Sequence, residues 1–360
     1  MENINLDESQ LRIVDGMIDW VRVVDKKNNV LYANKKMREE LGDFVGKKCY
    51  EVFCINKNCG NCISQTTIKN RSILKKEAKI GNKTYMVVSS PLMDKFGDTI
   101  CSVEVFRDIT KETDLANKIN EKNKKMTADI KFAKNMQMRM LPPKGMYNGM
   151  SIDYLYESSE SLSGDFFDVF QIDDENTGIY ICDVVGHGVT ASLLTVFVRQ
   201  SLRTIAKGNM SLNNIMKELH KTFLALNLDY DKYFSVFLGV YNKKTSEFSY
   251  VNAGHNSEPI LLRKDRTVEL LSSRGYPIAN IFDNVKYDVN QLKLNIGDKL
   301  FLYTDGITEA PNDNNQQYGI ERLVDIIYNE VNILERLKNS LDNYCKIHKD
   351  DYAILMAEII

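Results

Sequence analysis

The 360-residue sequence lacks any apolar run that approaches the roughly 18 to 20 residues of a membrane span, so no membrane span is predicted. Its net charge of -2 provides no overall basic field, which argues against nucleic acid as a partner. It contains no GxxxxGK(S/T) or GxGxxG motif, which argues against nucleotide binding. The N-terminal stretch MENINLDESQ is acidic and polar, unlike a signal peptide. Together these absences favour a cytoplasmic protein.

Cysteine is present but in an unusual arrangement. The chain contains seven cysteines. An odd number of cysteines, in a sequence without a secretory signal, argues against a disulfide framework. Four of them, Cys49, Cys54, Cys59 and Cys62, have the spacing C-x4-C-x4-C-x2-C. The close pair Cys59 and Cys62 could bind a metal ion or serve redox chemistry. The alternative is that these are small buried residues and a surface loop with free thiols. Cys101, on a predicted strand, is expected in the core.

The length and the 43% apolar content predict two domains with a connector. Short β runs alternate with turns from residue 8 to about residue 110, and helical spacing at Met37 and Leu41 interrupts them. This order resembles a PAS sensor domain: VRVVDKKNNVLYAN matches its opening hairpin and FRDIT its closing strand. The resemblance implies a ligand-binding or dimerising module over residues 1–110.

Residues 111–141 are rich in charge and contain neither glycine nor proline before Pro142. Apolar side chains recur at seven-residue spacing with two more between them: Ile119, Met126, Ala133, Met140, Ile130 and Met136. The pattern predicts a long amphipathic helix and a weak coiled-coil linker, because the second seam position is often Lys, Asn or Asp. The helix could connect and dimerise the chain, or could pack on its own domain.

A β-hairpin is predicted where FDVFQI and IYICDV flank the turn sequence DDENTG. The hairpin brings Asp165 and Asp168 toward Asp183. Like charges on paired strands are destabilising unless something positive lies between them, and a divalent cation is the simplest candidate. Alternation along the strand sends Asp165 and Asp168 to opposite faces, so only one can share a face with Asp183. The spacing does not decide which one.

Five motifs follow in order: SGDFFDVF, CDVVGHGVTAS, NAGHNSEP, LFLYTDGITEA and DDYAILMAEI. Together they resemble the SpoIIE type of the metal-dependent (PPM) serine/threonine phosphatases, over about residues 137–360. QMRMLPP resembles the QxxLLP segment that precedes this domain in regulated members. The resemblance implies an α+β fold, an α/β/β/α sandwich over residues 142–360. Strand and helix patterns independently predict two packed sheets with helices.

The resemblance also implies a site with two Mn²⁺ or Mg²⁺ ions. Its ligands would be Asp165, Asp183, which bridges both ions, the carbonyl oxygen of Val184, Asp305 and Asp350. Such ions prefer oxygen ligands and can activate a water for in-line attack on a phosphate. Asp305 or Asp350 alone could be an ordinary turn residue, but all the motif aspartates lie at strand ends.

Four further residues are candidates for supporting roles. His187 could protonate the leaving oxygen or hydrogen-bond phosphate, because histidine titrates near neutral pH; it could equally hold its turn. His255 is expected to be structural, bonding loops near the site. Asp168 and, more weakly, Asp351 are retained as additional acidic groups.

We expect a cytoplasmic protein serine/threonine phosphatase, similar to RsbU-like regulators, that the PAS domain controls through the linker. By the resemblance, its substrate is a phosphorylated STAS-domain protein, an anti-sigma-factor antagonist. A homodimer through PAS and linker is expected. The alternative function is a sensory binding module with a weakly active phosphatase fold that sequesters its partner. A third possibility is a hydrolase of small phosphoesters.

Overall fold

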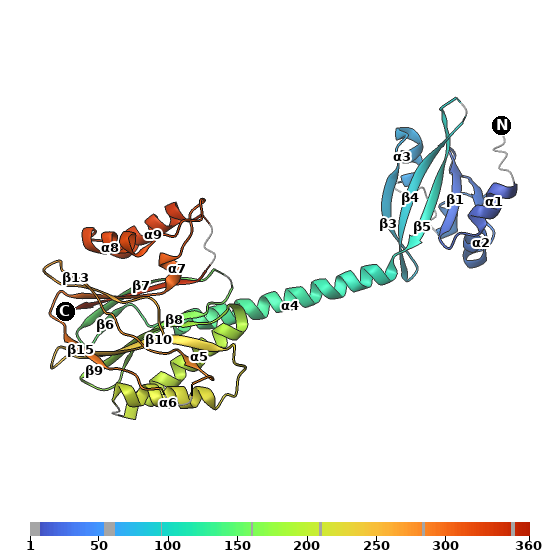
Figure 1. Cartoon of the computed structure of the whole chain (residues 1–360). Coiled ribbons are helices and arrows are strands. Elements are labelled where there is room, and N and C mark those ends of the chain that lie inside the picture. The colour runs from blue at the N-terminus through green and yellow to red at the C-terminus, as the bar shows by residue number, and fades with distance from the viewer. Residues whose placement is uncertain are drawn as a thin grey trace. The chain divides into compact units, whose positions relative to one another are not determined.

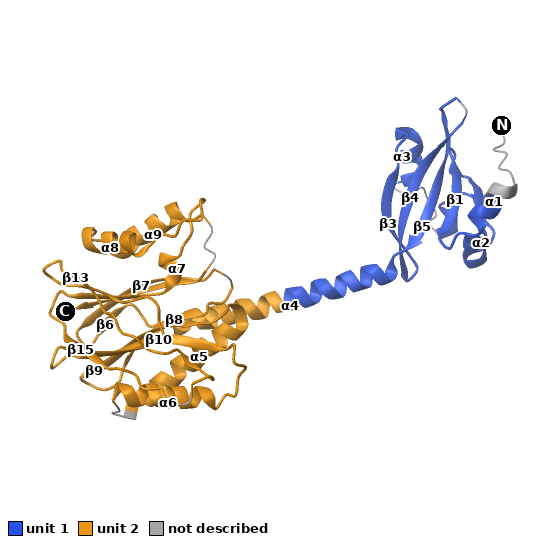
Figure 2. Cartoon of the chain, in the orientation of Figure 1, with its two compact units in different colours: residues 1–125 blue, residues 126–360 orange. Residues whose placement is uncertain are grey.

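The computed structural model describes residues 8–53, 62–94, 96–159, 161–208, 211–282, 285–346 and 350–360. The chain forms two compact units, Met1–Lys125 and Met126–Ile360 (Figure 2). The division falls within one long helix, α4 (Thr110–Met140), which confirms the helix predicted from the absence of glycine and proline. The three-part division at residues 110 and 141 stays a prediction.

The N-terminal unit is built on a five-stranded antiparallel sheet with the order β2-β1-β5-β4-β3. Its elements are α1 (Glu8–Asp15), β1 (Trp20–Asp25), β2 (Val30–Ala33), α2 (Lys35–Leu41), a 3-10 turn (Glu51–Phe53), α3 (Ile63–Asn70), β3 (Leu74–Ile80), β4 (Lys83–Met93) and β5 (Thr99–Asp108). The four predicted β runs all lie in this sheet. The strand β3 was not predicted, because its sequence LKKEAKI is mostly charged and its side chains are largely exposed.

Buried charge in this unit is paired. Arg22 on β1 and Glu104 on β5 are Cα partners in the sheet, and Arg22 Nε lies 2.6 Å from Glu104 Oε2. The hydroxyl of Ser64 on α3 donates to the other oxygen of Glu104, and Arg22 Nη1 donates to the Cys49 carbonyl. Both ions therefore have hydrogen-bonding partners, which offsets the cost of removing them from water.

The C-terminal unit contains two six-stranded sheets. In the first, the order is β15-β11-β10-β9-β8, with β14 paired to β10; in the second it is β13-β12-β16-β17-β7-β6. Its strands are β6 (Gly145–Tyr147), β7 (Met150–Glu157), β8 (Asp165–Gln171), β9 (Asn176–Val184), β10 (Tyr233–Asn242), β11 (Glu247–Ala253), β12 (Ile260–Leu262), β13 (Val268–Leu270), β14 (Ile278–Ala279), β15 (Asn290–Lys293), β16 (Lys299–Tyr303) and β17 (Tyr352–Ile359). The strand β7 was not predicted; it pairs with β17 along its whole length.

Helices cover the outer faces of both sheets (Figure 1). They are α5 (Gly188–Ile205), a 3-10 turn (Ala206–Gly208), α6 (Leu212–Leu224), α7 (Asp305–Thr308), α8 (Ile320–Asn329) and α9 (Ile333–Tyr344). On α5, Leu194, Val198 and Leu202 recur every four residues and are buried, so one apolar stripe attaches the helix to the first sheet. The α/β/β/α layering agrees with the expected sandwich.

The hairpin predicted around DDENTG is confirmed. Strand β8 pairs antiparallel with β9, and Asp165 and Asp183 are direct Cα partners. Asp168 lies opposite Tyr180 instead. Because partners in an antiparallel pair share a face, Asp165 shares a face with Asp183 and Asp168 does not. Among the described residues, no helix combines the length and hydropathy that a membrane crossing requires.

Candidate active site

Five aspartates meet at one end of the sandwich, where strands from both sheets begin or end. Asp165 begins β8, and Asp183 is the penultimate residue of β9. Asp305 follows β16 and begins α7, while Asp350 and Asp351 immediately precede β17. Since β16 and β17 are antiparallel neighbours, the end of one lies beside the start of the other. The fold thus brings together residues that are up to 186 positions apart in sequence.

Two glycines allow the backbones at this end to approach closely. A Cβ atom on Gly306 would clash with the carbonyl oxygen of Asp351, and one on Gly164 would lie 2.8 Å from the carbonyl oxygen of Val184. Neither glycine has a positive φ, so close approach rather than backbone conformation excludes a side chain there. The Asp-Gly sequence at Asp305 is therefore more than a turn signal, because Gly306 allows the start of α7 to pack against the strand entrance at Asp351.

The electrostatic environment of the cluster is unfavourable to negative charge. Burial and the adjacent Asp183 carboxylate raise the pKa of Asp165 well above its ordinary value, although the Thr304 hydroxyl acts in the opposite direction. Burial, followed by the charges of Asp305 and Asp350, raises the pKa of Asp183 to about 7. Burial also raises the pKa of Asp350. Several carboxylates close together in a partly dry site destabilise one another unless a positive charge is bound.

Within the described part of the chain, a buried oxygen of the cluster lacks a hydrogen-bond partner. Asp165 Oδ2 is buried, and it makes no hydrogen bond with any described residue. An unpartnered buried carboxylate oxygen is costly, and a divalent cation would compensate for it. The described residues contain no group of three or more His, Cys, Asp or Glu side chains already arranged to hold a metal ion. The donor set nevertheless fits Mg²⁺ or Mn²⁺, since Mg²⁺ binds through one or two carboxylates and retains several waters.

Asp351 has a different part in the site. Its Oδ1 accepts hydrogen bonds from the backbone N–H and hydroxyl of Ser159, and its Oδ2 accepts one from the Gly164 N–H at 2.8 Å. Both oxygens are therefore already engaged by the protein. Asp351 positions the segment that leads into Asp165, and its engagement explains why it is the weaker candidate for a metal ligand.

Asp168 lies outside the cluster, which corrects its retention as an acidic site residue. Its carboxylate forms two contacts with Arg203, Oδ2 to Nε at 2.5 Å and Oδ1 to Nη2 at 2.9 Å, and Oδ2 also lies 3.3 Å from Arg199 Nε. The side chain is completely buried on the face of β8 that packs against α5. The ion pair attaches α5 to the hairpin. No sequence signal links Asp168 to an arginine 35 residues later.

The two candidate histidines have distinct positions. His187 is exposed at the N-cap position of α5, and its interaction with Asp350 opposes the rise that burial causes in the pKa of that carboxyl, so it lies at the solvent edge of the cluster. His255 is buried, with Nδ1 3.2 Å from the Ser235 hydroxyl and Nε2 2.9 Å from the Tyr303 carbonyl. Burial lowers the pKa of His255 to about 4. A neutral His255 thus joins β10 to β16 beneath the site, as expected for a structural residue.

The predicted cysteine centre is not supported. Cys49 is buried in the core of the N-terminal unit, and Cys62 is partly exposed at the N-cap position of α3. Cys54 and Cys59 lie outside the described residues. The described part of the chain contains no metal-binding group that includes the other two cysteines. Cys101 is fully buried on β5, as expected.

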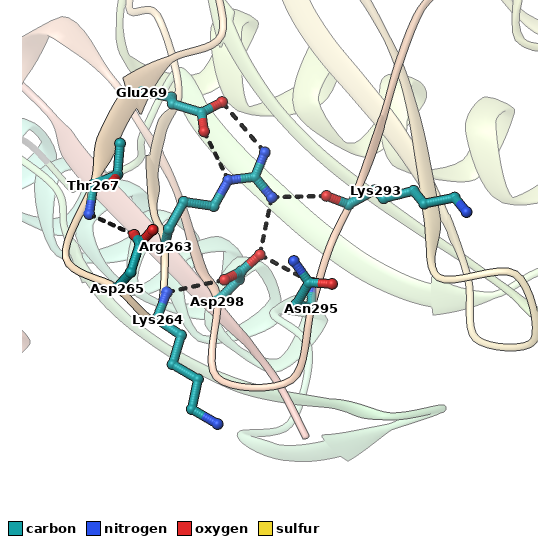
Figure 3. A pocket seen from close by; sticks show the side chains of 8 residues that line it. All are labelled: Arg263, Lys264, Asp265, Thr267, Glu269, Lys293, Asn295 and Asp298. Atoms are coloured by element: carbon teal, nitrogen blue, oxygen red, sulfur yellow. Dashed lines mark hydrogen bonds and ion pairs between the residues drawn. The ribbon is translucent and has the colours of Figure 1, made fainter.

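One hollow, shown in Figure 3, has none of the five clustered aspartates in its lining. It has a volume of about 680 Å³ and is lined by residues around the β12–β13 turn and the start of β16, the opposite end of that strand from Asp305. Arg263 bonds Glu269 and Asp298 there, and Asp298 also accepts from two backbone N–H groups. Arg263, Glu269 and Asp298 satisfy one another, so this part of the hollow is a structural ion-pair network.

A second hollow borders the cluster at Asp305. It has a volume of about 500 Å³, and Asp305 forms part of its wall with residues of the 256–258 loop, α7 and the start of α8. Tyr303 and Thr308 line it as well. Asp305 can therefore be reached from solvent through this hollow.

Comparisons with known proteins agree with this architecture. The family profile described as "Stage II sporulation protein E (SpoIIE)" matches residues 173–360. The phosphoserine phosphatase RsbP of Bacillus subtilis (strain 168) is 28% identical over 185 residues, covering 50% of this chain and 45% of RsbP. The phosphoserine phosphatase RsbU of the same organism is 24% identical over 236 residues, covering 64% of this chain and 69% of RsbU.

A solved structure supports the fold. The SiaA-PP2C domain of Pseudomonas aeruginosa superposes with a TM-score of 0.57 at 20% identity, covering 66% of this chain and 98% of that domain. At this identity the similarity concerns the fold alone. The match to RsbP spans less than half of that protein's length.

Proposed function

The chain belongs to the SpoIIE family, and from this membership we propose that it is a metal-dependent protein serine/threonine phosphatase. Its reaction hydrolyses a phosphoserine or phosphothreonine to the free hydroxyl and inorganic phosphate. The observation that carries the proposal is the cluster of Asp165, Asp183, Asp305 and Asp350, with raised pKa values at three of the four and an unpartnered buried oxygen on Asp165. The names of RsbP and RsbU as phosphoserine phosphatases support it.

The residues of the chain have separate roles in this proposal. Asp165, Asp183, Asp305 and Asp350, with the carbonyl of Val184, would hold two Mn²⁺ or Mg²⁺ ions. When bound, such ions lower the pKa of a water nucleophile and neutralise charge that develops on the phosphoryl group. His187, exposed at the N-cap position of α5, would give a proton to the leaving serine oxygen.

The test is manganese-dependent phosphate release from a serine-phosphorylated STAS-domain protein. Asp183→Asn is expected to lower the rate by at least about 100-fold, because it removes a carboxylate that would hold the metal. The matched control is Asp173→Asn, the same change in the exposed turn of the same hairpin, which should keep full activity. If Asp183→Asn kept its rate, the phosphatase assignment would be wrong. Tight partner binding without release from the unaltered chain would favour sequestration.

We further propose that the N-terminal unit is a PAS-type sensor that controls the site through α4. The supporting contact is Gln137 near the end of α4, which is buried: its Nε2 donates to the Ser163 carbonyl at 2.9 Å and to the Thr195 hydroxyl at 3.2 Å. Its Oε1 accepts from the Ser163 N–H. The Ser163 hydroxyl in turn bonds the backbone of Asp165. A change at the end of α4 therefore reaches the first site aspartate through two residues.

This control is tested by Gln137→Ala against Asn135→Ala, an exposed position on the same helix. Gln137→Ala is expected to change the rate of phosphate release, and the direction of the change shows whether the contact activates or restrains the site. Equal rates in both variants would contradict the role of Gln137.

A homodimer through the N-terminal unit and α4 also remains a proposal. Its support is that Ile119 and Met126, two members of the seven-residue repeat, are exposed on α4. Solvent-exposed apolar residues at the seven-residue repeat are typical of helices that pair with another helix. Sedimentation of the full chain measures the oligomeric state directly.

A further inference from the structure

An exposed aromatic surface begins beside the carboxylate cluster. Tyr233 is the first residue of β10, and Ser235, two positions later, is the direct Cα partner of Asp183. Residues two apart on a strand share a face, so Tyr233 lies on the same face as Asp183 and is its diagonal neighbour. The Tyr233 carbonyl accepts a hydrogen bond from the Val185 N–H, two residues beyond Asp183. This geometry ties Tyr233 to the edge of the site.

The surface continues over two loops that are joined to each other. The loop before β10 includes Leu228 and Tyr230, and the segment around β14 includes Tyr276 and Ile281. Tyr233 pairs with Ala279 in β14, and the Asn280 side-chain amide donates to the Leu228 carbonyl. The Tyr276 ring contacts the Phe282 ring at a centroid distance of 5.1 Å. Because backbone pairing and a side-chain bond connect the two segments, they lie side by side at this edge of the sheet.

We call this surface, formed by Tyr230, Tyr233, Tyr276 and Ile281, the aromatic patch. Their side chains are 78%, 41%, 61% and 64% exposed, respectively. Single exposed apolar residues are common on protein surfaces, but grouped ones next to a functional site indicate an interaction surface. Tyrosine is also enriched among the residues that dominate binding energy at protein interfaces.

We propose that the aromatic patch is the docking surface for the protein substrate, and that it binds apolar side chains lying beside the phosphorylated residue on the folded substrate. The inference rests on the proposed phosphatase function and extends it to substrate recognition. The supporting observation is continuity: Tyr233, at one end of the patch, is the diagonal neighbour of Asp183, so the patch adjoins the cluster that a protein-bound phosphate would enter. A small phosphoester in the cluster needs no such surface.

The experiment compares two substrates: a serine-phosphorylated STAS-domain protein and p-nitrophenyl phosphate, both with Mn²⁺. The variants are Tyr230→Ala with Tyr276→Ala, and separately Ile281→Ser. Matched controls are Tyr328→Ala and Ile296→Ser, which change exposed residues of the same types on α8 and before β16. Tyr233 is left unchanged, because its backbone supports the strand beside Asp183.

The double tyrosine variant is expected to lower kcat/KM for the phosphoprotein by about 10- to 100-fold, mainly through KM, as removal of interface tyrosines does. Its kcat/KM for p-nitrophenyl phosphate should stay within about twofold of the unaltered chain, and the controls should change neither value. Ile281→Ser should show the same selectivity with a smaller loss.

Three results would overturn the inference. The first is an unchanged kcat/KM for the phosphoprotein, and the second is an equal loss on both substrates, which would indicate damage to the site. The third is a change from dimer to monomer on sedimentation of the patch variants, which would assign the patch to a second copy of the chain. If the unaltered chain hydrolysed neither substrate, the proposed function itself would fail, and the inference with it.

Discussion

The two faces of the β8–β9 hairpin surround a buried aspartate with groups of opposite charge. On the face toward α5, the carboxylate of Asp168 meets Arg203 and Arg199. On the face toward the other sheet, Asp165 lies opposite Asp183. Burial raises the pKa of both Asp165 and Asp168, but the arginines counteract it at Asp168, whereas Asp183 adds to it at Asp165. A paired buried charge supports the fold, while an unpaired one indicates a ligand of opposite charge.

The N-terminal unit follows the pattern of Asp168. Glu104 is completely buried, yet Arg22 and Ser64 satisfy its oxygens. The contrast therefore does not separate one unit from the other. It separates buried acids that have a basic partner within the fold from the cluster at the end of the sandwich.

The largest effect expected from a single substitution is the loss of the ion pairs between Asp168 and the two arginines of α5. Asp168→Asn is expected to lower the free energy of unfolding by about 3 kcal/mol, because it leaves two partly buried arginines without a counter-charge. Urea unfolding measures the loss, and the rate per folded molecule should change by less than about threefold. Asp173→Asn is the control, with a change within about 0.5 kcal/mol. Unchanged stability would show that the pairing contributes little.

The second prediction concerns the aspartate cluster, where bound Mn²⁺ would supply the missing positive charge. Mn²⁺ at 100 times its Kd is expected to stabilise the chain by about 2.7 kcal/mol through preferential binding to the folded state. Thermal unfolding with and without EDTA measures the shift. Asp183→Asn should lose most of it, while the folded fraction of Asp168→Asn should retain it. An equal shift in both variants would place the metal elsewhere.

A smaller effect concerns the hydroxyl that supports Asp165. Thr304 is buried; its hydroxyl accepts from the Ala353 N–H at 3.0 Å and opposes the rise in the pKa of Asp165. Thr304→Val keeps the shape but removes the hydroxyl, so the apparent Kd for Mn²⁺ should rise about 10-fold. Thr304→Ser keeps the hydroxyl and should stay within about threefold. Calorimetric titration distinguishes them; a similar Kd in both would contradict the role.

The last expected effect, the smallest when expressed per pH unit, is a pH dependence of the metal-free chain. The pKa of Asp183 is about 7 in the folded state and ordinarily 3.8, so the folded chain retains its proton more strongly. Its contribution to stability is complete below about pH 4 and is lost as pH rises through 7, with a slope of at most about 1.4 kcal/mol per pH unit. Urea unfolding in EDTA should show this slope, and Asp183→Asn should flatten it. An unchanged slope in the variant would refute it.

Local sequence pattern was sufficient for several of these features. The turn residues between FDVFQI and IYICDV predicted the hairpin, and the absence of glycine and proline predicted α4. Both depend on interactions between residues near one another in sequence, which composition and spacing report directly. The charged strand β3 was not predicted, because its few apolar residues bury little surface. Its position in the sheet depends on pairing with β4.

The tertiary structure decided the rest, because the deciding partners lie far apart in the chain. Sequence alone determined that only one of Asp165 and Asp168 could face Asp183, since alternation along a strand is fixed by backbone geometry. Which one does depends on register, and register follows from packing both faces of the hairpin at once. The arginines of α5 satisfy Asp168 on one face, and the second sheet brings Asp305 and Asp350 to the other. No local pattern carries that information, because burial and proximity between distant segments exist only once the two sheets have packed.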